Sequence, residues 1–175
     1  MGRSKQVAGV CAGVLLTATS AAAQPSPDAA LSAAAGHPVY GWSSQRTWDA
    51  QVVTWLGRGA SAVAVADVQA RVIHVGPWAL GQLRKVGGTA RGYLAAQDQA
   101  FALLALGHEA AHVEGVRDET AAYCEGWRRL PGLAATLGAS RKQVVRMRDA
   151  VKAVAARLWL SRCDSDASTE RRGSR

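Results

Sequence analysis

The sequence predicts an α+β fold that is mostly helical, in a single domain with a helical core and a small strand component. Three stretches are rich in helix-forming residues, at 94–106, 118–137 and 140–160. One short stretch, 71–75, alternates apolar and polar residues as a half-buried strand does. The chain has 175 residues, and the part after residue 23 is long enough for one sizeable core.

The N-terminus has the pattern of a signal peptide over residues 1–23. Arg3 and Lys5 form a positively charged n-region, residues 7–16 are apolar, and the alanines at 21–23 offer a cleavage site. An uncleaved membrane anchor is the alternative, but the apolar run is shorter than the roughly 20 residues that span a bilayer. We therefore expect a protein without a stable membrane anchor, secreted to the extracellular space or the cell envelope.

Short elements are expected before the long helices. Residues 24–38 are rich in Ala and Pro and are expected to form a flexible leader, and the aromatic residues of 40–55 are expected in the core. A strand is predicted at 71–75, within the apolar run 62–75. A short helix follows from Pro77 to Val86, and two glycines then end it.

Three helices are predicted after these glycines. The stretch 94–106 lacks Gly and Pro and continues into the residues that follow it. The stretch 118–137 is expected to break at Pro131. The helix at 140–160 begins with Ser140-x-x-Gln143, which has the spacing of a capping box.

The segment His108-Glu109-Ala110-Ala111-His112 carries the chemistry of the chain. Residues four apart on a helix lie on the same face, so His108 and His112 can bind one metal ion. Glu109 lies about 100° around the helix, by the period of 3.6 residues, and is placed to act on a water at the metal. The pattern predicts a catalytic zinc site on an active-site helix, with Glu109 as general base.

Two neighbouring acids can supply the third ligand. Gly115 is the natural end of the active-site helix, and Asp118 and Glu119 follow that turn. Either carboxylate would leave the fourth position of the zinc ion to water, as a catalytic zinc site requires. Asp118 is the first choice and Glu119 the alternative, although Asp118 would also serve as the N-cap of the next helix.

The segment from His108 to Asp118 resembles the extended HExxHxxGxxD motif of metzincin zinc peptidases in its snapalysin-like form, and so the zincin metallopeptidases in general. It is also similar to small secreted bacterial proteins that carry a metallopeptidase signature. The resemblance implies a zincin-like domain at 39–163 that hydrolyses peptide bonds. No recognisable Met-turn follows the motif, and a helix that opens with Glu119 is similar instead to the glutamate helix of gluzincins, in which Glu119 would bind the metal.

By the same resemblance, a strand is expected to border the cleft and pair with the substrate backbone, and the strand through His74 is the candidate. His74, Tyr93 and Tyr123 are candidate donors to the oxyanion, and the spacing of the sequence does not choose among them.

Two cysteines remain after the signal peptide, Cys124 and Cys163. An even pair in an exported protein is most simply a disulfide bond. The alternative, that both bind zinc, is less favoured because the two cysteines do not form a Cys-x-x-Cys pair.

The chain is basic, with 21 Lys and Arg against 13 Asp and Glu. Many cations lie along the helix 140–160 and in the polar tail 164–175, which is expected to be disordered. Neither stretch has the interleaved aromatics of a specific nucleic-acid reader, and attraction to anionic cell-wall polymers stays open. The predicted function is a secreted zinc-dependent metallopeptidase (hydrolase) acting on a peptide or protein substrate through a zinc-bound water activated by Glu109. The alternative is a non-enzymatic binding or structural module on a zincin-derived scaffold.

Overall fold

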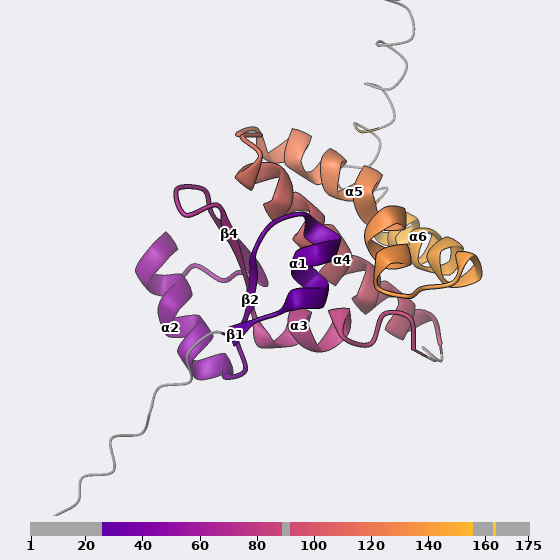
Figure 1. Ribbon diagram of the computed structural model, residues 1–175, viewed down its shortest axis with the longest axis horizontal. Coiled ribbons are helices and arrows are strands. Elements are labelled where there is room, and N and C mark those ends of the chain that lie inside the picture. The colour runs from indigo at the N-terminus through magenta and orange to yellow at the C-terminus, as the bar shows by residue number, and fades with distance from the viewer. Residues whose placement is uncertain (1–25, 89–91, 156–162, 164–175) are drawn as a thin grey trace, which may run out of the picture.

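The computed structural model describes residues 26–88, 92–155 and 163, so the predicted signal peptide and basic tail lie outside the described residues. A small sheet lies between helix α2 on one side and the helices α4, α5 and α6 on the other (Figure 1). The predicted fold class, mostly helical α+β, is confirmed. In the described ranges, no helix combines the length and the apolar character needed to cross a membrane.

The sheet has four short strands in the order β1-β2-β4-β3. Strand β2 pairs in parallel with β4, while β1 pairs antiparallel with β2 and β3 antiparallel with β4. Strand β3 is therefore an edge strand. The strands are β1 (Ser26–Pro27), β2 (Val39–Gly41), β3 (Ala64–Asp67) and β4 (Val72–Val75).

Helices α3 to α6 correspond to predicted helices, whereas α1 and α2 were not predicted. Residues 156–160 of the last predicted helix lie outside the described residues. The helices are α1 (Ala29–Ala35), α2 (Gln45–Leu56), α3 (Pro77–Leu83), α4 (Tyr93–Val113), α5 (Glu119–Thr136) and α6 (Arg141–Ala155). The expected break at Pro131 does not occur, because α5 continues through it. The predicted capping box opens α6, with the Ser140 N–H donating to Gln143 Oε1 at 2.8 Å.

The structure corrects the expectation of a flexible leader at 24–38. Residues 26–38 contain β1 and α1, and the Asp28 side chain caps α1 by accepting from the Leu31 N–H. Leu31 is only 1% exposed and belongs to the main core. The alanines of this segment favour a helix, and the Asp28 cap stabilises its first turn. The buried Leu31 packs that helix against the main core.

The two faces of the sheet pack against different partners. Val39, Ile73 and Val75 point into the main core, where α4 is the central helix. A second small core of Trp42, Trp48 and Val52 joins α2 to the other face. The expectation that the aromatic segment is mainly core is thus confirmed for Trp42 and Trp48, which are 6% and 1% exposed.

Candidate metal centre

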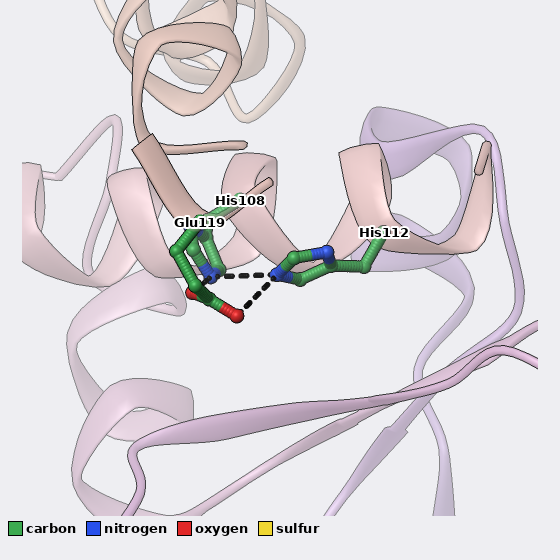
Figure 2. A group of neighbouring side chains, drawn as sticks. All are labelled: His108, His112 and Glu119. Carbon is green, nitrogen blue, oxygen red and sulfur yellow. Dashed lines mark hydrogen bonds and ion pairs between the residues drawn. The ribbon is translucent and has the colours of Figure 1, made fainter. Parts of the chain in front are cut away.

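His108 and His112 lie one turn apart on α4 and face each other. Their Nε2 atoms are 3.0 Å apart, and the ring planes are nearly perpendicular. Both side chains come from the C-terminal half of α4, whose Ala- and Leu-rich sequence is buried in the core. The two imidazoles are thus held on a rigid element, with their nitrogens directed at a common point (Figure 2).

The turn that ends α4 orients His112. Gly115 adopts a positive φ of 102°, which favours glycine, and the chain then brings the Val116 carbonyl back to the ring. His112 Nδ1 lies 2.6 Å from the Val116 oxygen. A carbonyl can only accept, so Nδ1 carries the proton, and in the neutral ring Nε2 keeps its lone pair for a metal.

Glu119 supplies the third donor from the first turn of α5. Its Oε2 lies 3.2 Å from His108 Nε2, and its Oε1 lies 3.4 Å from His112 Nε2. Figure 2 shows the carboxylate directed at both rings. The alternative third ligand of the sequence analysis is therefore the acid that the structure brings to the histidines.

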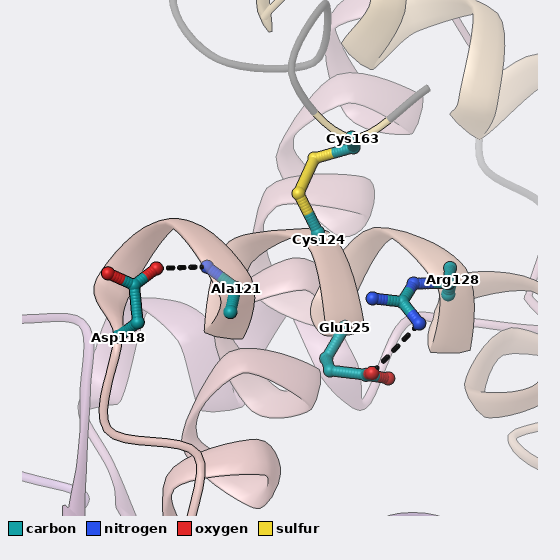
Figure 3. The surroundings of a disulfide bond; sticks show 6 residues. All are labelled: Asp118, Ala121, Cys124, Glu125, Arg128 and Cys163. Atoms are coloured by element: carbon teal, nitrogen blue, oxygen red, sulfur yellow. Dashed lines mark hydrogen bonds and ion pairs between the residues drawn. A yellow bond between two sulfur atoms is a disulfide. The ribbon is translucent and has the colours of Figure 1, made fainter. Parts of the chain in front are cut away.

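Asp118, the first choice, has a different position. Its Oδ1 accepts from the Ala121 N–H at 2.8 Å, which makes Asp118 the N-cap of α5 (Figure 3). Capping directs the carboxylate along the start of the helix, whereas Glu119, one residue later, points across to α4. The structure therefore places Glu119, and not the first choice Asp118, beside the two histidines.

His108, His112 and Glu119 form a group that could hold a metal ion, with donor atoms within 4.8 Å of one another. The distances between the donor atoms show whether this group fits a zinc ion. Four ligands arranged tetrahedrally around zinc at its usual bond lengths lie roughly 3.3 Å apart. The two Nε2 atoms are 3.0 Å apart, which is close to that value, and each imidazole has one of the two Glu119 oxygens at 3.2 or 3.4 Å. In addition, His108 Nδ1 is buried without a partner among the described residues.

The local environment disfavours a charged His108. Burial lowers the pKa of its imidazole, and the neighbouring His112 lowers it further, while Glu119 acts in the opposite direction. A neutral imidazole is the form that binds metals. Burial and the second histidine therefore favour the form of His108 that can act as a ligand.

Glu109 lies beside the donor group but is held by the sheet. Its Oε2 accepts from the Ala66 N–H of β3 at 2.8 Å, and its Oε1 lies 4.0 Å from His108 Nε2. Burial raises the pKa of the Glu109 carboxyl to about 7, partly offset by His112 and by the Ala66 bond. The carboxyl is thus fixed next to the donors by one backbone contact.

Two cavities meet at His108 and Glu109. The first, of about 710 Å³, extends along α4 toward Phe101 and also borders α2 and α3. The second, of about 550 Å³, extends toward the turn at 115–117 and Glu119. Both are lined by Ala62 and Ala64 at the edge of the sheet. Together they form a cleft that passes the donor group on both sides.

Strand β3 borders this cleft, not the strand through His74. That strand is β4, which is paired with β2 on one side and β3 on the other. An internal strand has no unpaired backbone groups to offer, so the expectation that it would pair with a substrate is wrong. The apolar run 62–75 in fact contains two strands, and the sheet edge on the cleft belongs to the first.

The three candidate oxyanion donors lie in different places. Tyr123 lines the first cavity, and its ring centroid lies 4.3 Å from that of His108. Tyr93 instead donates its hydroxyl to the Ala150 carbonyl of α6. His74 accepts from the Trp42 indole at 3.4 Å and contacts Trp55, on the face of the sheet that α2 covers. Of the three, only Tyr123 is at the cleft.

The helix that carries Glu119 is also joined to the C-terminal part of the chain. Cys124 of α5 and Cys163 form a disulfide bond, with the sulfurs 2.09 Å apart (Figure 3). Glu125, which is partly buried, and the exposed Arg128 form an ion pair on the same helix. The predicted cysteine pairing is thus present, one turn beyond the metal donor.

Several groups that orient the side chains of the site could not be recognised in the sequence. The Val116 carbonyl and the Ala66 N–H are backbone groups, which have no signature in the side chains of the sequence. Gly107 and Gly126 are different, because both are glycines within predicted helices, and such glycines indicate a close approach of two backbones. This signal could have identified the contact between α4 and α5.

The chain was compared with protein-family models, with curated proteins and with solved structures, and none of these comparisons gives a match.

Proposed function

We propose that this protein is a zinc-dependent metallopeptidase. The observation that carries the proposal is the convergence of three side chains that could hold a metal ion, beside a buried carboxyl group and between two cavities. His108, His112 and Glu119 would hold the metal. Three protein donors are typical of catalytic zinc sites, because the fourth position is needed for water or substrate.

Zinc bound by this group would polarise a carbonyl and lower the pKa of a water molecule toward 7. Glu109 is placed to accept the proton of that water and later to donate it to the leaving amine, because its carboxyl lies beside the donors without belonging to them. The Ala66 N–H holds the carboxyl in this position. The proposed role of β3 is therefore to orient the general base as well as to border the cleft.

A peptide is the substrate class that the cleft supports. The edge strand β3 offers backbone groups to an extended chain, and cavities on both sides of the donor group give room to side chains. We further propose that the protein is exported. The disulfide between Cys124 and Cys163 supports this, because such bonds persist in oxidising compartments.

The test compares the purified protein with Glu109→Gln, with His112→Ala and, as a control, with Glu125→Gln, which changes a partly buried glutamate outside the donor group. Zinc content is measured by elemental analysis, and hydrolysis of a mixture of unstructured peptides by mass spectrometry. We expect one zinc ion per chain and hydrolysis in the wild type and the control. Glu109→Gln should keep zinc and lose hydrolysis, and His112→Ala should lose both.

Two results would overturn the proposal. A folded wild type that takes up no zinc would remove the metal centre. Zinc binding without hydrolysis of any peptide would leave a metal-binding scaffold and exclude the peptidase.

A further inference from the structure

The first cavity has mostly apolar walls. It begins at His108 and Glu109, and Phe101 and Leu104 of α4 form one side. Trp78 of α3 and the stretch 62–64 contribute further apolar surface. A side chain that enters this cavity from a substrate in the cleft would therefore lie against carbon atoms over much of its length.

Helix α2 adds a different surface to the same cavity. Gln45 and Asp49 lie one turn apart on α2 and both line the cavity. Both side chains are exposed, and the Gln45 amide donates to Asp49 Oδ1 at 2.7 Å. A carboxylate has acceptor capacity for several hydrogen bonds, so this contact leaves most of it available.

Among Asp, Glu, Lys and Arg, only acidic residues line the first cavity. Asp49 and Glu109 are its acids, and no Lys or Arg lines it. Among the described residues, Asp49 forms no ion pair with a cation of the chain. The second cavity has a mixed lining, because Arg117 borders it together with the acids Glu109 and Glu119.

We propose that the first cavity selects a lysine or arginine side chain of the substrate, with Asp49 as the specificity-determining residue. Lys and Arg combine an apolar stem with a cationic end, which matches apolar walls together with an unpaired carboxylate. A purely apolar side chain would fill the walls but bring no cation to Asp49. This inference rests on the proposed peptidase function, since it concerns the same cleft.

The experiment uses short acetylated and amidated alanine peptides that differ in one central residue. Lysine and norleucine are the matched pair, because they share the straight carbon stem and differ in the charge. Glutamate is the opposite-charge peptide. The full-length, zinc-loaded wild type is compared with Asp49→Asn, with Asp49→Lys and with the control Asp149→Asn, which changes an exposed aspartate of α6.

Two readouts are recorded for every peptide. The first is kcat/KM for hydrolysis. The second is the Kd of the same peptides for zinc-loaded Glu109→Gln, with and without Asp49→Asn, which measures recognition without turnover. We expect the wild type and the control to prefer lysine over norleucine about threefold, as one exposed ion pair allows. Asp49→Asn should bring the ratio close to one, and Asp49→Lys should favour glutamate.

The outcomes separate the inference from the function. Hydrolysis with equal rates for lysine and norleucine would overturn the inference and leave the peptidase. Preferential binding of the lysine peptide, lost in Asp49→Asn, without any hydrolysis would support the inference and overturn the peptidase. Neither hydrolysis nor preferential binding would overturn both.

Discussion

Gly107 of α4 and Gly126 of α5 form a close helix crossing, where a Cβ added to Gly107 would lie 2.9 Å from the Gly126 Cα. A Cβ added to Gly126 would lie 2.7 Å from the Leu104 carbonyl oxygen and 3.1 Å from the His108 nitrogen. These are backbone atoms within helices and cannot move aside easily. The crossing therefore sets the distance between α4, which carries both histidines, and α5, which carries Glu119.

The first prediction concerns this crossing. Gly126→Ala should push α5 away from α4 and so move Glu119 away from the histidines. We expect a loss of stability of about 1–3 kcal/mol, as overpacking usually costs, and a weaker zinc affinity. The measurements are thermal unfolding and zinc titration.

The matched control for Gly126→Ala lies on the same helix. Gly132 is exposed, and a Cβ added there would meet nothing within 4 Å. Gly132→Ala should therefore stabilise the protein by roughly 0.5–1 kcal/mol through the better helix propensity of alanine and leave zinc affinity unchanged. Equal effects of the two substitutions on zinc binding would contradict the role of the crossing.

Asp118 and Glu119 are predicted to have separate effects, because the first caps α5 and the second faces the histidines. Asp118→Ala should cost about 1 kcal/mol of stability and retain zinc. Glu119→Ala should lower zinc affinity more than about 100-fold and change the stability of the metal-free protein little. Chemical denaturation and zinc titration of both variants measure the difference, and a loss of zinc in Asp118→Ala alone would reverse the assignment.

Removal of the disulfide should lower stability without removing the metal site. The bond joins residues 39 positions apart, and a loop of that length corresponds to about 4 kcal/mol in the chain-entropy account. We expect the double variant Cys124→Ala, Cys163→Ala to unfold at a lower temperature, to keep its zinc, and to be insensitive to reductant. If the reduced wild type lost its zinc before unfolding, the bond would be part of the metal site.

His74 is predicted to make stability depend on pH. Burial lowers the pKa of its imidazole, and Asp67 acts weakly in the opposite direction. The unfolded chain therefore binds the proton more readily, so the stability that neutral His74 provides is present above about pH 6.5 and lost as the pH falls below it. Asn at this position can still accept from the Trp42 indole, so His74→Asn should reduce the drop in Tm between pH 8 and pH 5. Parallel pH profiles of wild type and variant would contradict this.

The sequence was sufficient for the features that depend on local periodicity. The Ala- and Leu-rich stretch before His108 predicted α4. The spacing of four residues between His108 and His112 predicted that both histidines share one face of that helix. The choice between Asp118 and Glu119 could not be made in the same way. It depends on where α5 begins, to within one residue, and helix boundaries are the part of an element that sequence patterns define least.

The sheet was harder to predict because its strands are short and its pairing is non-local. The apolar run 62–75 predicted one strand. In the structure the chain turns back between Asp67 and Val72, so that the run forms the two strands β3 and β4. Which of the two strands lies at the edge is decided by the pairing of β4 with β2, a contact between distant parts of the chain. The position of β3 at the cleft follows from that pairing and has no signature in the local sequence.

The turn at Gly115 brings together groups that are close to one another in the sequence. All three metal donors and the carbonyl that orients His112 lie between positions 108 and 119, so the loop that must close to assemble them is short and its entropy cost is small. In the proposed function, Ala66 would orient the general base and Asp49 would contact the substrate, and both come from far earlier in the chain. Metal retention would then depend on one helical hairpin and selectivity on contacts across the whole fold, so changes to the N-terminal half would alter the substrate preference while the ion stays in place.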